Sequence, residues 1–315
     1  MVLSKKKIKI SIIIATFNRA HLIEETLDSI LNQSFKNWEC LIIDDGSTDN
    51  TKEILRPYLL KDSRFNYYER SKDHKKGLPG CRNQGLETAK GDYIIFFDDD
   101  DIVHPDNLKI CAEYLSDKDL YFCRYDKRPF QGELKPDFTT QNIDFTQKSV
   151  NINELENIVI GNLPFASCTV LWKRECFESH RFKEELLYAE EWECYTRILS
   201  TGIKGISIDK VLYYNRKHPN SNTGEFYNFD PVRRASNLMA IKLVINNLSK
   251  KGLLSPNVVQ YFIRTGFFLK EISVIEAVLK HSNAGAFKKL KYLWGFRIYP
   301  FLKPFFNLKA KLKKS

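Results

Sequence analysis

The chain has 315 residues, of which 43% are hydrophobic and 28% charged, so it is expected to be globular rather than disordered or collagen-like. At roughly 150 residues per domain, this length allows two domains or one large domain with an appendage. The net charge is +10 at pH 7. The seven cysteines are odd in number and lack C-x-x-C spacing, which argues against a zinc site and against an extracellular disulfide framework.

The first hundred residues alternate between apolar runs of strand length and stretches with the three-to-four-residue apolar spacing of a helix. Strands separated by helices of about three turns predict parallel βαβ units. The expected strands cover residues 10–15, 40–43, 65–68 and 93–97, and the expected helices cover residues 22–31, 51–60 and 80–90.

Polar side chains gather directly after three of these strands. Thr16 and Asn18 follow the first strand, Asp44 and Asp45 the second, and Asp98–Asp101 the fourth. In parallel α/β sheets, ligands bind beyond the carboxyl ends of the strands. A ligand site is therefore predicted at this edge of the sheet.

The four consecutive carboxylates Asp98–Asp101 repel one another unless a cation or solvent relieves the repulsion. Oxygen ligands of this kind suit Mg²⁺ or Mn²⁺. Two other interpretations stay open from the residues alone. The run could be a solvated acidic turn before a helix that begins at Pro105. It also comes close to the D-x-D-x-T/V motif of haloacid dehalogenase-type phosphatases, although that motif usually follows the first strand of its fold.

Beyond residue 120 the pattern is mixed, with short strands such as residues 169–172 and a helix expected to begin near Glu190. After residue 225 the chain becomes helical and aromatic. Asp230–Pro231 and Ser255–Pro256 each place a capping residue before a proline at the first helical position. We therefore predict an α/β domain over residues 1–225 and a helical, basic C-terminal extension over residues 226–315.

Residues 280–315 carry ten basic and no acidic side chains, which equals the net charge of the whole chain. Eight aromatic residues lie between Phe287 and Phe306. A helix over this segment would place aromatic side chains on one face and lysines off it, as in helices that lie in a membrane interface. We therefore expect an anionic membrane surface as partner and no nucleic acid. Packing of the extension on its own domain is the main alternative, and binding of nucleic acid is a weaker one.

Four motifs in order make the chain resemble glycosyltransferase family 2, whose members have the GT-A fold. The resemblance is strong over residues 8–115, fair to about residue 220 and absent beyond. It implies a single Rossmann-like α/β domain with a mixed, mostly parallel sheet. Residues 1–115 would then bind the nucleotide, and residues 116–225 would face the acceptor. The motif residues are Ile10–Arg19, Leu41–Asp49, Gly80–Leu86 with Ala89–Ile94, and Phe97–Asp101 followed by Pro105.

The resemblance implies nucleotide contacts at several positions. Asp45 matches the aspartate that recognises the base. Thr16 and Asn18 lie where the first loop of the family touches the nucleotide. Arg82 would face the diphosphate, where a guanidinium fork matches phosphate oxygens.

Asp98 and Asp100 match the D-x-D pair of the family. Asp100 is implied to bind a divalent metal, Mn²⁺ or Mg²⁺, that bridges the diphosphate. Asp98 would contact the ribose or metal-bound water and is counted among both the metal-site residues and the nucleotide contacts, and Asp99 is placed with the nucleotide contacts. His218 lies in a basic segment that resembles one closing over the diphosphate, and it is included among the metal-site residues.

Glu190 and Glu191 resemble the acidic pair of the family, usually Glu-Asp, at the start of a helix. Because the second acid is the base of the family, Glu191 is expected to take the proton of the attacking hydroxyl, and Glu190 is the alternative. The implied reaction is one displacement with inversion. In it, the metal and Arg82 stabilise charge on the departing nucleoside diphosphate.

The chain is thus predicted to be an inverting glycosyltransferase of polysaccharide biosynthesis. Its donor would be a nucleotide sugar, expected to be a UDP-sugar, and its acceptor a hydroxyl of a glycan or lipid-linked glycan. We expect a cytoplasmic enzyme, peripheral on the inner face of the cell membrane. The alternative is a non-catalytic GT-A protein that binds a nucleotide sugar or a polyanion.

Overall fold

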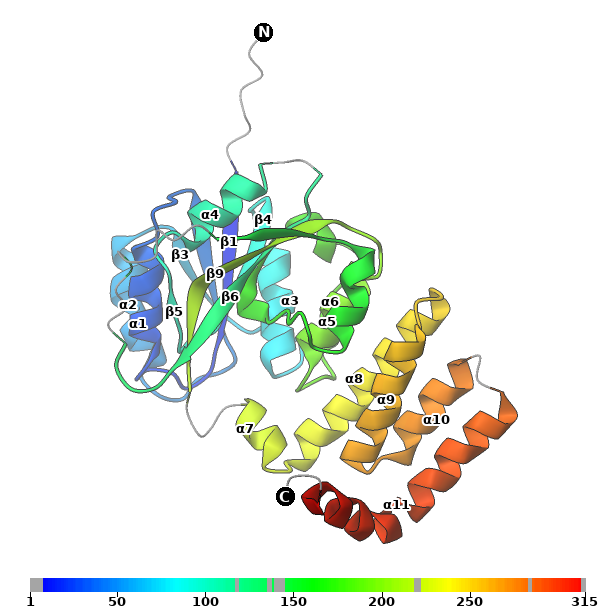
Figure 1. The fold of residues 1–315 in the computed structure, drawn as a ribbon. Helices are drawn as coiled ribbons and strands as arrows, with labels where there is room; N and C mark the ends of the chain where they lie inside the picture. The colour runs from blue at the N-terminus through cyan, green and yellow to red at the C-terminus, as the bar shows by residue number, and fades with distance from the viewer. Residues whose placement is uncertain are drawn as a thin grey trace.

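The structure, a computed structural model, describes residues 8–116, 119–134, 138, 145–217, 222–282 and 285–312. Figure 1 shows a central sheet with helices on both faces and a group of further helices at one side. The strands are β1 (Ile10–Thr16), β2 (Trp38–Asp44), β3 (Phe65–Glu69), β4 (Tyr93–Phe97), β5 (Ile102–Val103), β6 (Phe122–Phe130), β7 (Gln147–Val150), β8 (Val170–Lys173) and β9 (Gly205–Arg216). The helices are α1 (Ile23–Leu31), α2 (Thr51–Lys61), α3 (Leu78–Thr88), α4 (Asn107–Tyr114), α5 (Leu155–Val159), α6 (Glu190–Leu199), α7 (Asn222–Tyr227), α8 (Pro231–Lys250), α9 (Pro256–Leu269), α10 (Ile272–His281) and α11 (Ala286–Leu312).

The sheet is mixed and has the order β3-β2-β1-β4-β8-β6-β9-β5, with β7 also pairing with β9. The four strands β3-β2-β1-β4 are parallel, so the predicted βαβ half is confirmed. In the other half, β6 and β9 are parallel, whereas β8, β5 and β7 run antiparallel to their neighbours. The acidic run follows β4, which lies near the middle of the sheet.

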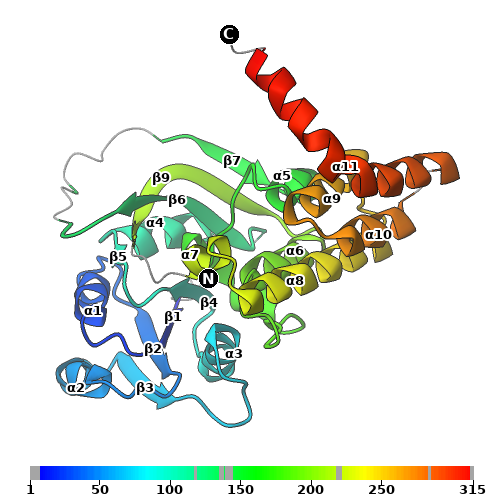
Figure 2. The same ribbon diagram turned by 90° about the horizontal axis from the view of Figure 1, so that it is seen from below.

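Both faces of the sheet are buried. Successive side chains of a strand point to opposite faces, so each strand contributes to two cores. Ile12 and Ile14 of β1 pack in one core with α1, α2 and α4. Ile13 packs in a second core with α3, α5 and α6. This second core continues without a break into α8, α9 and α10, and Figure 2 shows α8 beside α6.

The helical extension begins where its capping signals predicted. The Asp230 carboxylate accepts a hydrogen bond from Arg233 N at 2.8 Å before α8, and the Ser255 hydroxyl accepts one from Val258 N at 3.2 Å before α9. The predicted domain boundary at residue 225 falls inside α7 and stays a prediction. In Figure 2 the last part of α11 projects away from the other elements.

Hydropathy along the helices bears on how the protein could meet a membrane. Within the residues that the structure describes, none of the helices combines the length and the apolar character needed to cross a bilayer.

Candidate active site

Hydrogen bonds join the loops that follow β1 and β2. Asp45 N donates to the Thr16 carbonyl at 2.9 Å. Asn18 N donates to the Ser47 hydroxyl at 2.9 Å, and the Asn18 side chain accepts from Thr48 N at 2.8 Å. Asn18 has φ 55°, a left-handed conformation that asparagine tolerates better than most residues. The structure thus brings Thr16, Asn18 and Asp45 together, and their contact with a nucleotide stays a prediction.

Asp45 is nearly buried, and both of its carboxylate oxygens have partners. Arg70 Nε donates to Oδ1, and Gly77 N donates to Oδ2 at 2.9 Å. Gly77 has φ +122°, and a Cβ there would lie 2.9 Å from Leu187 Cδ2, so this position requires glycine. Sequence reasoning missed Arg70, because a single arginine after β3 belongs to no motif.

The acidic run after β4 meets both cationic side chains and main-chain donors. Arg19 Nε lies 3.3 Å from Asp99 Oδ1, and Arg216 N donates to Asp101 Oδ1 at 2.7 Å. Burial raises the pKa of Asp99 to about 7, against the effect of Arg19. Burial also raises the pKa of Asp101 to about 8, and repulsion by Asp98 and Asp100 adds to this. A cation bound here would relieve the cost of ionising these carboxyl groups.

Among the described residues, Asp98, Asp101 and Cys168 offer a fitting place for such a cation. One potential ligand atom from each lies within 4.8 Å of the other two. The two carboxylates suit Mg²⁺ or Mn²⁺, whereas burial raises the pKa of the Cys168 thiol, which would have to lose its proton to bind a metal. Asp98 was predicted as a ligand, whereas Asp101 and Cys168 were not. Asp100, the predicted metal ligand, is absent from this group, and His218 lies outside the described residues.

Arg82 of α3 connects the acidic run to the acid pair at the start of α6. Its Nη1 lies 3.0 Å from Glu190 Oε1 and 3.9 Å from Glu191 Oε2, and its Nη2 lies 3.5 Å from Asp98 Oδ1. Nη2 also donates to the Ser167 hydroxyl at 3.0 Å. The guanidinium is almost fully buried. The predicted contact of Arg82 with a diphosphate stays a prediction, and its contacts here are with three carboxylates.

Glu190 and Glu191 are neighbours in sequence but differ in environment. Consecutive helical residues project about 100° apart, so one side chain is directed inward while the next reaches solvent. Glu190 is buried, and burial together with the charge of Glu191 raises its pKa to about 8, although Arg82 opposes the shift. The Glu191 side chain is 31% exposed. Glu191 is therefore the acid of the pair that an incoming molecule could reach.

Lys127 of β6 also lies at this cluster, and sequence reasoning missed it. Its Nζ lies 3.9 Å from Cys168 Sγ. Proximity to Cys168 raises its pKa, and Asp98, Asp101 and Glu191 contribute. In the sequence, Lys127 belongs to a basic pair of the kind that usually lies on a solvated surface.

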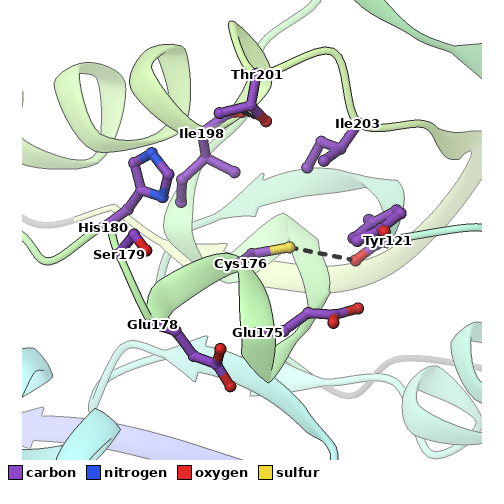
Figure 3. Close-up of a pocket in the computed structure, with 9 residues that line it drawn as sticks. All are labelled: Tyr121, Glu175, Cys176, Glu178, Ser179, His180, Ile198, Thr201 and Ile203. Carbon is purple, nitrogen blue, oxygen red and sulfur yellow. Dashed lines mark hydrogen bonds between the residues drawn. The ribbon is translucent and has the colours of Figure 1, made fainter.

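A separate cavity of about 230 Å³ lies at the opposite edge of the sheet, and Figure 3 shows its lining. Its lining residue Tyr121 accepts a hydrogen bond from Lys173 N, and Lys173 pairs with Tyr93 at the start of β4, whereas the acidic run follows the end of β4. The cavity is lined by Tyr121, Glu175, Cys176, Glu178, Ser179, His180, Ile198, Thr201 and Ile203. None of the described residues predicted for the site is among them.

The chain is similar to known glycosyltransferases in sequence and in fold. The family model "Glycosyl transferase family 2" matches residues 11–175, just over half of the chain. An uncharacterized glycosyltransferase of Rickettsia conorii is 29% identical over 93% of this chain and 46% of its own length, so the chain spans less than half of that relative.

One further relative and one solved structure carry more specific names. The UDP-Glc:α-D-GlcNAc-diphosphoundecaprenol β-1,3-glucosyltransferase WfaP of Escherichia coli is 29% identical over 73% of this chain and 85% of its own length. The mannosyltransferase PcManGT of Pyrobaculum calidifontis was solved with GDP-Man and Mn²⁺. It superposes with a TM-score of 0.57 at 19% identity, covering 96% of this chain and 84% of its own, which indicates a shared fold.

Proposed function

Because the chain belongs to glycosyl transferase family 2, we propose that it transfers a sugar from a nucleoside-diphosphate sugar to an acceptor hydroxyl, with inversion at the anomeric carbon. One observation carries the proposal. A buried guanidinium, that of Arg82, holds Asp98 of the acidic run and Glu191 of the acid pair within 4 Å of itself. The residues proposed to bind the donor and to accept the proton therefore lie close to the same guanidinium.

Glu191 is the proposed general base, because its side chain reaches solvent while that of Glu190 is buried against Arg82. The acceptor hydroxyl loses its proton to the Glu191 carboxylate as its oxygen bonds to the anomeric carbon. The bond from that carbon to the diphosphate oxygen breaks at the same time, and the nucleoside diphosphate leaves. Glu190 fixes the orientation of Arg82 in this scheme.

Asp98, Asp101 and Cys168 are the residues proposed to hold a divalent cation, with Asp100 adjacent in the run. A cation there would supply Lewis-acid stabilisation of the departing diphosphate. The Mn²⁺ in the similarly folded mannosyltransferase supports the presence of a divalent cation.

We propose a UDP-sugar as donor and a lipid-linked glycan as acceptor. The E. coli relative supports both, because its name gives UDP-Glc as donor and a diphosphoundecaprenol-linked sugar as acceptor. Asp45 is the proposed contact for the base. Its two carboxylate oxygens offer four lone pairs, and the donors from Arg70, Gly77 and Cys81 leave one for a base N–H.

The test is a panel of nucleotide sugars incubated with the purified full chain, with Mn²⁺ or with excess chelator. We expect slow release of free nucleoside diphosphate from one donor with Mn²⁺, and faster turnover when a lipid-linked acceptor is added. Nucleotide binding without release from any donor would favour the non-catalytic alternative. Release of inorganic phosphate would instead favour the phosphatase interpretation of Asp98–Asp101.

We further propose that α11 holds the protein on the cytoplasmic face of an anionic membrane. One side of α11 packs on the extension, where Phe296 and Tyr299 each lie 5.3 Å, between ring centroids, from Phe267 of α9. A second apolar stripe faces away from these contacts, and its members recur every three or four residues. The stripe consists of Phe287, Leu290, Trp294, Ile298 and Phe301, all exposed.

Charge supports a lipid partner for this apolar stripe of α11. Lys291 and Arg297 are exposed on the same helix, and no acidic residue follows Glu276. An exposed apolar stripe flanked by cations fits the boundary between anionic headgroups and acyl chains.

Flotation with anionic vesicles tests this proposal. We expect Phe287→Ser/Phe301→Ser to lose most of its vesicle binding, because two exposed rings leave the stripe. Leu60→Ser/Val232→Ser removes two exposed apolar side chains from other helices and should float like the wild type. Equal flotation of both double variants would exclude the stripe as the anchor. If the wild type sediments as a dimer and Phe287→Ser/Phe301→Ser as a monomer that still floats with vesicles, the apolar stripe would instead bind a second copy of the chain.

A further inference from the structure

We infer that Ser236 and Arg233 of α8 are positioning residues for the acid pair Glu190–Glu191. The inference rests on the proposed function, which places the general base in that pair. It assigns the helical extension a part in the reaction, although no proposed catalytic side chain lies in it.

The Ser236 hydroxyl makes two hydrogen bonds to the main chain of Tyr188, two residues before the pair. It accepts from Tyr188 N at 2.8 Å and donates to Tyr188 O at 2.8 Å. Ser236 is buried, so water cannot easily replace these bonds. Arg233 Nη1 donates to the carbonyl of Leu187, one residue earlier. Two consecutive carbonyls ahead of α6 are therefore held from α8.

The start of α8 is itself fixed in place. Arg233 N donates to the capping Asp230 carboxylate at 2.8 Å, and Arg233 Nε donates to Glu225 Oε2 at 2.9 Å. From α7, the ring of Phe226 stacks on that of Tyr188, with centroids 4.6 Å apart and planes 7° apart. Main chain and side chain of the segment before the acid pair are thus held by the same two helices.

Ala189, between this segment and the pair, shows why such support is needed. It has φ 63° and ψ 21°, a left-handed conformation that is unfavourable for a residue with a Cβ. Strain of this kind persists only where surrounding contacts enforce it. The turn that it makes directs Glu190 to Arg82 and leaves Glu191 exposed.

The same segment also reaches the loop that holds Asp45. A Cβ on Gly77 would lie 2.9 Å from Leu187 Cδ2, so the two residues are in close contact. Gly77 N donates to the Asp45 carboxylate. A shift of Leu187 would therefore be felt at both proposed ends of the site.

The experiment uses two test variants, each with a matched control. Ser236→Ala is compared with Ser249→Ala, which removes a hydroxyl near the other end of α8. Arg233→Met is compared with Arg234→Met. Arg234 donates to the Leu269 carbonyl of α9, so it serves packing within the extension. We expect Ser236→Ala and Arg233→Met to lower kcat about 10-fold, because small misplacements of a base are costly. Donor KM should change less than about 3-fold. Ser236→Thr keeps the hydroxyl and should restore most of kcat, and both control variants should match the wild type.

Amide hydrogen exchange supplies a readout that does not depend on turnover. Exchange at residues 188–191 should accelerate in Ser236→Ala and stay at the wild-type rate in Ser249→Ala. The inference would be overturned if Ser236→Ala and Arg233→Met both kept wild-type kcat and wild-type exchange while the separate variant Glu191→Gln was impaired. That outcome would leave the proposed function intact. If Glu191→Gln and Glu190→Gln both turn over like the wild type, the proposed base fails and the inference fails with it, even if exchange changes.

Discussion

The parallel half of the sheet and the helical extension differ in how they serve the same site. In the parallel half, the proposed donor contacts stand directly after strands, so a local sequence pattern marks each of them. In the extension, α8 acts through hydrogen bonds to main-chain carbonyls that no pattern marks. Motifs therefore mark the proposed reacting groups but not the residues proposed to hold them in place.

The two regions also differ in their charge. In the acidic run after β4, burial and repulsion between neighbouring carboxylates raise the pKa of Asp99 and Asp101 although Arg19, Arg82 and Lys127 lie close by. The ten basic residues after residue 279 have no acidic neighbours in sequence, and the rest of the chain sums to about zero. We expect each excess to be met by something outside the chain, a divalent cation in one region and anionic lipid in the other.

The largest expected effect is on the acid pair. Glu191→Gln should lower kcat by roughly 10²–10⁴, because the amide keeps the shape of the side chain but accepts no proton. Donor affinity should change little. Glu190→Gln is the matched comparison and should be milder, because this side chain is buried against Arg82. Steady-state kinetics of the two variants measure both effects. A larger loss of kcat in Glu190→Gln than in Glu191→Gln would assign the general base to Glu190.

The next effect concerns the acidic run. Asp98→Ala should lower turnover by about 10²–10³ by removing both a proposed cation ligand and a partner of Arg82. Mn²⁺ titration followed by electron paramagnetic resonance should show weaker binding. Asp106→Ala, at the start of α4, is the control. Comparing Asp100→Ala with Asp101→Ala then tells which second carboxylate binds Mn²⁺, since the sequence predicts Asp100 and the geometry favours Asp101.

A smaller effect is expected from charge on the extension. Lys291→Glu/Arg297→Glu should weaken binding to anionic vesicles about 10- to 100-fold, because each cation near such a surface contributes about 1 kcal/mol. Lys242→Glu/Lys250→Glu makes the same charge change on α8 and should bind nearly as the wild type. The difference between the two variants should shrink at 0.5 M salt, where screening is stronger. An equal loss in both variants would mean that net charge, rather than α11, controls binding.

The smallest effect is the dependence of stability on pH. The pKa of Glu190 is raised by burial from 4.5 to about 8, so the folded chain binds a proton that the unfolded chain has released across this range. The stabilisation is present below pH 4.5 and is lost as pH rises to about 8. Glu190→Gln should therefore gain about 1–3 kcal/mol relative to the wild type between pH 5 and pH 8. Urea unfolding at both values measures this, and parallel pH dependences in the two proteins would contradict it.

Much of the fold could be predicted because its signals are local. The strands at residues 10–16, 38–44, 65–69 and 93–97 and the starts of α8 and α9 fell where apolar runs and capping pairs indicated. The long strands β6 and β9 were not predicted, because each carries charged residues along its exposed part.

The candidate site was predictable only in part, for a related reason. Cys168 reaches the acidic run although nothing near it in sequence suggests a ligand. Arg70 enters the site just after β3 and Lys127 from within β6, and neither belongs to a motif. Their roles depend on which strands become neighbours, and that is a property of the whole sheet.

The sequence by itself determined the family, the βαβ order and the polar residues at the strand ends, since hydrophobic period and motif spacing are short-range properties of the chain. Only the tertiary structure decided that Arg82 meets Glu190 across 108 residues and that Ser236 holds Tyr188 across 48. It also decided that Glu190 faces inward while Glu191 stays exposed. The physical reason is that the packing of α6 against α5 and α8 sets its rotation, and the left-handed Ala189 is tolerated only while that packing holds it.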